Sequence, residues 1–162
     1  MYLPEEIFVK KGGIIDETTD RKIVFDRYDS IGNLIEYHHE NSEPIAVIWG
    51  YNNQYPIAKI ENSNSADIGS FVSNLQTLSD ADTDEISETQ LRAALASLQN
   101  ETILENAQMT YYTYDPLIGV TSITDPKGET TYYHYDEFNR LQVVKDAEGN
   151  VLSKNEYHYK NQ

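Results

Sequence analysis

Turn signals recur at a nearly constant interval in the last third of the chain. They start at Asp115, Asp125, Asp136 and Asp146, so successive starts lie ten or eleven residues apart. Between them lie short runs rich in Tyr, Thr, Val and Ile, which are residues that favour strands. Turn signals at this spacing are typical of short antiparallel strands joined by tight turns. The interval therefore predicts an all-β repeat architecture, in which each unit buries part of its neighbour.

The residue types in each turn explain why the chain reverses there. At 125–128 (Asp-Pro-Lys-Gly), proline sets φ, the aspartate can accept amide hydrogen bonds, and glycine allows a left-handed backbone. The turn at 146–149 has the same spacing without proline. The turn at 136–139 ends in asparagine, which also tolerates positive φ, and 29–32 is a further match. We expect one turn geometry at all four sites.

The turns divide both ends of the chain into candidate strands. In the C-terminal third we expect them near residues 109–114, 120–124, 130–135, 141–145 and 151–159. In the N-terminal part we expect them near residues 5–10, 21–28, 33–40, 45–51 and 57–61. Because the two ends share this pattern, residues 1–65 and 106–162 should form one twisted antiparallel sheet of hairpins. The expected fold class is mainly β, in a single domain.

Residues 66–105 change the hydrophobic period from two to about 3.6. Helical spacing is shown by Ile68, Phe71, Val72, Leu75 and Leu78, and then by Leu91, Leu95 and Leu98. The pattern predicts an inserted hairpin of two amphipathic helices, near 67–78 and 86–99. Ser87 followed by Gln90 fits a capping box. The insertion has many acidic residues and a single basic one, Arg92, so its polar face should be solvated.

Net charge and cysteine content exclude several classes of partner and site. The chain has 27 acidic and 12 basic residues and a formal net charge of -15, which disfavours nucleic acid and anionic membrane surfaces. No run is apolar and long enough to span a membrane, and the first residues do not resemble a signal peptide. The absence of cysteine excludes disulfides, thiolate metal sites and cysteine nucleophiles. We expect neither nucleic-acid binding nor direct membrane insertion.

Repeated strings that lead into turns carry a family resemblance. Residues 112–115 and 133–136 both read Tyr-x-Tyr-Asp, and the second string continues through Asn-Arg-Leu at 139–141 to a valine-rich strand. Residues 28–34 are another match. These strings resemble the YD repeat of the RHS and teneurin-like proteins, over most of the chain outside the helical insertion. Residues 48–60 resemble a segment near the C-terminal end of bacterial RHS-repeat proteins.

The resemblance implies a function based on the repeats themselves. In that family the repeats build a long spiralling β-sheet, which can close into a shell, on secreted or surface-attached proteins. We therefore expect a non-enzymatic structural segment near the end of a longer chain, continuing or capping such a shell. Its partners would be upstream RHS repeats of the same chain or another surface protein. The alternatives are a carbohydrate-binding surface module and part of a shell that encloses a toxin.

Aromatic residues are the candidate contacts for a glycan or a protein partner. Tyr112 with Tyr114, and Tyr133 with Tyr135, place two rings on one face of a strand because side chains alternate with a period of two. Such rings can stack on sugars, although cross-strand packing that fixes the register is their commoner role. Trp49 is the other aromatic candidate for either role.

Other reactive side chains indicate no metal, cofactor or catalytic site. His38 and His39 are neighbours on an expected strand and should point to opposite faces. His134 and His158 lie in similar Tyr-His-Tyr strings, but an intervening strand should keep them too far apart to share an ion. The acidic run at 80–84 lacks the glycine and glutamate of an EF-hand, so a solvated linker is preferred over a weak calcium site. No carboxylate pair or serine motif indicates an enzyme.

Overall fold

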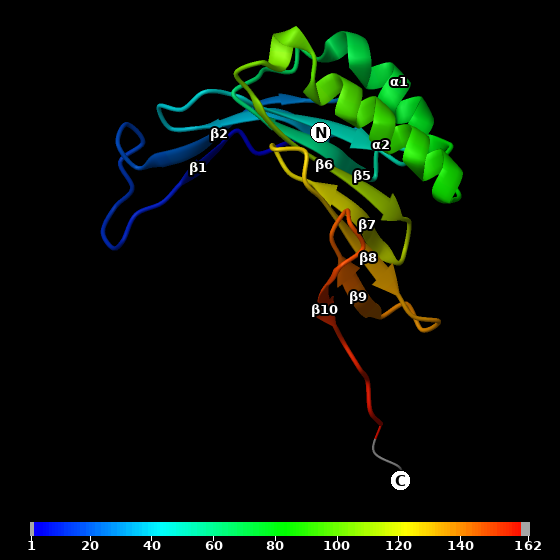
Figure 1. Cartoon of the computed structure of the whole chain (residues 1–162). Coiled ribbons are helices and arrows are strands. Elements are labelled where there is room, and N and C mark those ends of the chain that lie inside the picture. Colours follow the sequence, from blue (N-terminus) through cyan, green and yellow to red (C-terminus); the bar gives the residue numbers. More distant parts are fainter. Residues whose placement is uncertain (1, 160–162) are drawn as a thin grey trace.

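The computed structural model describes residues 2–159, whose ten strands form one continuous curved sheet (Figure 1). Each strand pairs antiparallel with the next one along the chain, from β1 to β10. The strands are β1 (Glu6–Phe8), β2 (Arg21–Tyr28), β3 (Leu34–His39), β4 (Ile45–Gly50), β5 (Tyr55–Glu61), β6 (Gln108–Asp115), β7 (Gly119–Thr124), β8 (Thr130–Tyr135), β9 (Leu141–Lys145) and β10 (Val151–Lys154). The expected mainly β class, with its antiparallel repeat sheet, is confirmed.

All the helices of the described residues lie between β5 and β6. They are α1 (Gly69–Asp80), α2 (Glu85–Gln99) and the short 3-10 helix η1 (Thr102–Leu104). Ala58 of β5 nevertheless pairs with Tyr111 of β6, so the helical hairpin interrupts the chain without interrupting the sheet. Figure 1 shows α1 and α2 side by side on the outer side of the curved sheet, where they contact β4 and β6.

The hydrophobic core lies between the helical hairpin and the middle of the sheet. Fully buried side chains come from both layers: Ile48, Ile57, Ile60 and Met109 from the strands, and Leu75, Leu91, Leu95 and Leu98 from the helices. Towards the two ends of the sheet the strands are less covered, and all four residues of β10 are exposed. The helices therefore provide the apolar layer that a lone meander of hairpins lacks.

Helix α2 has a capping box, but not the expected one. The side chain of Asp84 accepts a hydrogen bond from the amide of Ser87 (2.8 Å), and Ser87 Oγ accepts one from the amide of Asp84 (3.0 Å). The prediction of a box formed by Ser87 and Gln90 was wrong by one helical turn. Aspartate is among the strongest N-cap residues, so Asp84 begins the helix and Ser87 takes the third helical position.

Both terminal strands are shorter than expected. β1 covers only Glu6–Phe8 instead of 5–10, because its register with β2 shifts between Ile7 and Phe8. β10 ends at Lys154 instead of 159, although the amide of Asn155 still donates to Gln142 O of β9 (2.9 Å). Strands at the edge of a sheet have a partner on one side only, so their ends depend on few hydrogen bonds.

Candidate functional site

The four predicted turns share one hydrogen-bond pattern. In the turn between β7 and β8, Asp125 Oδ1 accepts hydrogen bonds from the amides of Lys127 (2.8 Å) and Glu129 (2.9 Å). Equivalent bonds run to Asp29 from Ile31 and Asn33, to Asp136 from Phe138 and Arg140, and to Asp146 from Asn150. The fourth residue is left-handed each time, with φ of 98° at Gly32, 84° at Gly128, 59° at Asn139 and 85° at Gly149. The prediction of a common geometry is confirmed.

The turn that starts at Asp115 has its left-handed residue one position earlier than the other four turns. As in those turns, the amide of the fourth residue, Ile118, donates to the carbonyl of the aspartate, Asp115 O (3.0 Å), and Pro116 is the second residue of the turn. Leu117 is the left-handed residue, with φ of 72°, and its side chain is 93% exposed. This position normally takes glycine or asparagine. The regular interval in the sequence therefore includes one turn of a different kind.

A tyrosine hydroxyl joins neighbouring strands at four equivalent places. Tyr135, at the end of β8, donates a hydrogen bond to Val120 O at the start of β7 (2.9 Å). Similar bonds run from Tyr28 to Pro4 O (2.7 Å), from Tyr114 to Pro56 O (2.9 Å) and from Tyr157 to Leu141 O (2.8 Å). We call Tyr28, Tyr114, Tyr135 and Tyr157 the clamp tyrosines. Each clamp tyrosine lies at or just beyond the end of one strand and binds a residue at or just before the start of the preceding strand.

Tyr157 corrects the expected alignment of the last Tyr-His-Tyr string. The spacing places Tyr157 in the role of Tyr133, but its hydroxyl bond gives it the role of the clamp residue Tyr135. His158 then stands where Asp136 follows Tyr135, so no aspartate is present to start another turn. The repeat pattern is therefore shifted by two residues at this end of the sheet.

Three of the five aromatic candidates donate hydrogen bonds to backbone carbonyls of this chain. Trp49 Nε1 donates a hydrogen bond to Leu34 O (2.8 Å), and the ring is partly buried. Tyr114 and Tyr135 are clamp tyrosines, and burial raises the pKa of Tyr114 to about 12 and that of Tyr135 in the same direction. The polar atoms of these three side chains are engaged within the fold, which makes them structural residues first.

The remaining candidates, Tyr112 and Tyr133, lie on the sheet face opposite the helices. This open face consists of Phe25, Tyr37, Val47, Lys59, Tyr112, Ile123, Tyr133 and Val144, which the strand register places on one side. Within residues 2–159, the hydroxyls of Tyr112 and Tyr133 have no hydrogen-bond partner. Lys59 Nζ donates to Glu61 Oε1 (2.6 Å), which raises the pKa of Lys59. Tyr112 and Tyr133 therefore keep free hydroxyls, and the Lys59–Glu61 pair lies near Tyr112 on the same face.

The acidic linker between the helices binds the β4–β5 turn instead of being merely solvated. Tyr51, Asn52 and Asn53 are three successive left-handed residues, with φ of 51°, 57° and 59°. Asparagine tolerates this conformation as a single residue, but three left-handed residues in succession, one of them tyrosine, are strained. The amide of Asn52 donates to Asp80 Oδ1 (2.5 Å) and the Tyr51 hydroxyl to Asp82 Oδ2 (2.6 Å). These acidic side chains hold the turn, and burial raises the pKa of Asp82.

The histidines are separated by the sheet. His38 pairs with Val24 and His39 with Ile23 across β2 and β3, which confirms that the two side chains point to opposite faces. His38 Nδ1 lies 2.7 Å from Asp26 Oδ2. His134 is on β8, and β9 lies between it and the segment that carries His158. Among the described residues, no three His, Asp or Glu side chains are grouped to hold a metal ion.

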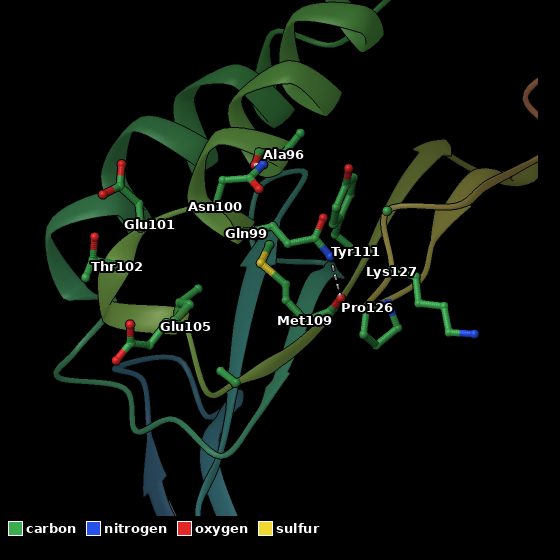
Figure 2. A pocket seen from close by; sticks show the side chains of 13 residues that line it. Ala96, Gln99, Asn100, Glu101, Thr102, Glu105, Met109, Tyr111, Pro126 and Lys127 are labelled. Atoms are coloured by element: carbon green, nitrogen blue, oxygen red, sulfur yellow. Dashed lines mark hydrogen bonds between the residues drawn. The ribbon is translucent and has the colours of Figure 1, made fainter.

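A hollow of about 710 Å³ lies between the end of α2, η1 and the β7–β8 turn (Figure 2). Gln99 Nε2 crosses its floor and donates to Met109 O (3.1 Å) and Asp125 O (3.0 Å). Figure 2 shows Glu101 and Lys127 pointing away from the hollow. The polar group at the floor is thus bound to backbone, and the charged groups at the rim do not converge.

A second groove of about 380 Å³ runs between the start of α2 and strands β6–β8. Arg92 lies over the ring of Tyr132, 5.4 Å from its centroid, and pairs with Glu88 one helical turn earlier. Glu88 also accepts a hydrogen bond from Thr113 Oγ1 (3.1 Å). Arg92 and Glu88 therefore bind each other and the sheet, and so link α2 to the strands.

Arg140 is the residue that sequence reasoning missed. Its guanidinium binds Asp136 Oδ2 (2.6 Å), and this bond holds the pKa of that carboxyl below its usual range. It also faces three aromatic rings, with centroids at 4.2 Å for Tyr157, 5.0 Å for Phe138 and 5.4 Å for Tyr159. Arg140 therefore fastens the residues after β10 to the β8–β9 turn. The available signal was the Asn-Arg-Leu string together with aromatic residues in the following repeat.

Comparison with known families identifies one part of this sheet. Residues 119–151 match the family model described as RHS Repeat. The matched range begins at β7, contains β8 and β9, and reaches the first residue of β10. No curated protein matches the chain. The match confirms the resemblance seen in the Tyr-x-Tyr-Asp strings and covers three of the four turns that share one geometry.

Proposed function

Because residues 119–151 match the RHS Repeat family model, we propose that this chain is an RHS-type repeat protein and acts as a non-enzymatic structural and interaction segment. It continues or caps a β-repeat shell near the C-terminal end of a longer secreted or cell-surface protein. Residues 1–65 and 106–162 act as one repeat domain, and residues 66–105 are an insertion into it. Its partners are upstream RHS repeats of the same chain or another surface protein.

The observation that carries this proposal is the hydrogen bond that each of the four clamp tyrosines makes to a backbone carbonyl. Each clamp uses a hydroxyl group to fasten one strand to the strand before it, for example Tyr135 to Val120. All buried side-chain nitrogen and oxygen atoms of the described residues have hydrogen-bond partners. A catalytic site needs convergent polar groups that stay available to a substrate. The distribution of polar groups thus favours a scaffold whose surfaces are strand edges and sheet faces.

The match to the RHS Repeat family model also supports the proposed location. RHS repeats are generally found on extracellular or surface proteins and associate with other repeats of their chain. No helix in residues 2–159 is long and apolar enough to cross a membrane. Intact cells that produce the parent protein should release peptides of this chain when treated with a protease, while a cytoplasmic control protein stays whole. Release only after lysis would overturn the proposed location.

A carbohydrate-binding module is the second candidate, and the open face favours it. Tyr112 and Tyr133 present rings with free hydroxyls, and the Lys59–Glu61 pair lies on the same side of the sheet. Aromatic rings combined with a few polar groups are typical of sugar sites. A glycan array would support this alternative if binding is saturable and is lost in both Tyr112→Ala and Tyr133→Ala. The scaffold proposal predicts no binding across cell-wall sugars.

The toxin-enclosing alternative draws support from curvature alone. The helices cover the outer side of the sheet in Figure 1, so the open face would line the interior if further repeats closed a shell. Toxin-bearing members carry an Asp-Pro-x-Gly-Leu element, whereas residues 125–129 end in Glu129. Mass spectrometry of the protein made in its own cells separates these cases. A chain that ends uncut at Gln162 opposes the toxin alternative, and a product cleaved within this segment supports it.

A further inference from the structure

The outer edge of the last strand is open along its whole length. β10 pairs with β9 on one side, and the described residues place nothing on its other side. Every residue from 147 to 159 is exposed, including Val151 (58%), Leu152 (60%) and Tyr159 (76%). Beyond β10 the chain still follows β9, through the Asn155 amide bond to Gln142 O and the Tyr157 hydroxyl bond. We call residues 151–157 the C-terminal edge.

The backbone groups of this edge are arranged to accept another strand. The amide of Asn155 faces β9, because it donates to Gln142 O (2.9 Å). The backbone groups of successive residues in a strand alternate in direction, so those of Lys154 and Glu156 face outward. An edge of this kind is a template for strand addition. Because His158 replaces the turn aspartate after Tyr157, this part of the chain starts no local hairpin that would cover the edge.

We propose that the C-terminal edge pairs with the same edge of a second copy of this chain, antiparallel and centred on Asn155. In this register Lys154 lies opposite Glu156 of the second copy, and the two-fold axis creates that pair twice. Opposite charges directly across from one another stabilise an antiparallel ladder. The charges of the C-terminal edge are therefore self-complementary.

The other end of the sheet is a poorer template. β1 contains only three residues, and Glu6 at its start is paired with Arg21 of β2 (3.1 Å). Short and charged edge strands discourage pairing with another chain. A two-fold contact through β10 also closes after two copies, whereas contact between β10 and β1 would build a ring or an open filament. The inference rests on the proposed function, which treats strand edges as interaction surfaces. It adds that the partner at the C-terminal edge is a second copy of this chain.

Charge reversal tests the pairing directly. In sedimentation experiments over a wide concentration range, the wild-type chain should show a monomer–dimer equilibrium. Lys154→Glu and Glu156→Lys each place like charges opposite one another and should weaken dimerisation roughly tenfold. The double variant Lys154→Glu/Glu156→Lys restores opposite charges and should regain dimerisation. Lys127→Glu, at the exposed β7–β8 turn, makes the same charge change away from the edge and should have no effect.

A single cysteine tests the register. The natural chain has no cysteine, so Asn155→Cys introduces the only thiol. Residues directly opposite in a non-hydrogen-bonded antiparallel pair have Cα atoms about 4.5 Å apart, within reach of a disulfide. Mild oxidation should therefore cross-link Asn155→Cys. Ser153→Cys lies opposite Tyr157 of the second copy and should not cross-link, because its own counterpart is about 13 Å away along the strand.

Two outcomes would overturn the pairing. One is a wild-type chain that stays monomeric at every concentration while its circular dichroism shows folded β-structure. The other is a dimer that ignores the charge reversals and cross-links equally well, or not at all, through both cysteines. Either result leaves the scaffold proposal standing. Conversely, a chain found only inside lysed cells would remove the proposed location without changing the mass of the purified protein.

Discussion

Gly119 lies directly beneath Tyr135, and the position of the Tyr135 ring requires that residue 119 has no side chain. A Cβ atom on Gly119 would come within 2.3 Å of the Tyr135 hydroxyl oxygen and 2.8 Å of the ring carbon that bears it. The bare backbone of Gly119 lets the ring cross the start of β7 and reach Val120 O. At the equivalent places, Tyr55 stacks on Tyr114 (5.0 Å) and Arg140 on Tyr157 (4.2 Å). At three of the four clamps, this position thus carries a flat side chain or none.

Gly119→Ala should destabilise the sheet by about 1–3 kcal/mol, because the methyl group displaces the Tyr135 ring. Tyr135→Phe should cost about 1 kcal/mol through the lost hydroxyl bond. Since both changes act on the same clamp, the double variant should lose less than the sum. Urea unfolding measures all three. Gly69→Ala is the matched control, since a Cβ there meets nothing within 4 Å. Strictly additive losses would refute the proposed contact.

Ser79 links α1 to the strained β4–β5 turn and tolerates no apolar replacement. Its buried Oγ accepts a hydrogen bond from the amide of Tyr51 (3.0 Å) and donates one to Gln76 O (2.9 Å). Ser79→Ala leaves the Tyr51 amide without a partner and should reduce stability by about 1–3 kcal/mol. Thermal and urea unfolding provide the measurement. Ser97→Ala, on the exposed side of α2, should leave stability unchanged or slightly higher. Equal effects of the two substitutions would contradict this role.

Low pH should reduce the stability that the turn after β8 contributes to the fold. The Arg140 guanidinium lowers the pKa of Asp136 from its ordinary value of 3.8. A lowered folded-state pKa means that the ionised carboxylate stabilises the fold above about pH 4, and that this contribution disappears as pH falls through the lowered value. Asp136→Asn should therefore be less stable than wild type at neutral pH and should lose less stability on acidification. Urea midpoints measured across the acid range would contradict this if both proteins showed parallel curves.

High pH should reduce the stability of the fold by ionising buried tyrosine side chains. Burial raises the pKa of Tyr114 from 10.0 to about 12, so the neutral phenol stabilises the fold. This contribution is complete below pH 10 and is lost as pH rises through 12. Tyr114→Phe should cost about 1 kcal/mol at neutral pH, through its lost bond to Pro56 O, and should reduce the alkaline loss. Phenolate absorbance and urea unfolding can follow both effects. An unchanged alkaline loss would show that Tyr114 does not contribute to it.

Much of the sheet was predictable because its signals are local. Each shared turn depends on one aspartate and on one left-handed residue three positions later, such as Asp125 with Gly128. Strand alternation then places His38 and His39 on opposite faces without further information. The two helices also follow from spacing, since Leu91 and Leu95 recur at one helical turn and face the core. Local rules of this kind need no knowledge of distant contacts.

The roles of individual tyrosines were not predictable, because they depend on register. Tyr133 and Tyr135 are two residues apart and similar in sequence, yet only Tyr135 reaches a backbone carbonyl of the preceding strand. The strand register is shifted between His134 and Tyr135, and no sequence pattern indicates that shift. The contact of Asp82 with Tyr51 likewise joins segments that are distant in the sequence. Such contacts exist only once the helices pack on the sheet.

Lengthening the repeat is the most direct measurement of whether this chain is an extendable β-scaffold. A second copy of residues 125–145, inserted after Lys145, places the aspartate turn at 125–128 where the turn at 146–149 begins and adds two strands. The lengthened chain should unfold in one cooperative transition, at least as stable as wild type and with more β-structure by circular dichroism. A scrambled copy of the same residues should remain unfolded and protease-sensitive. If the faithful copy behaves like the scrambled one, the account of a modular repeat scaffold is wrong.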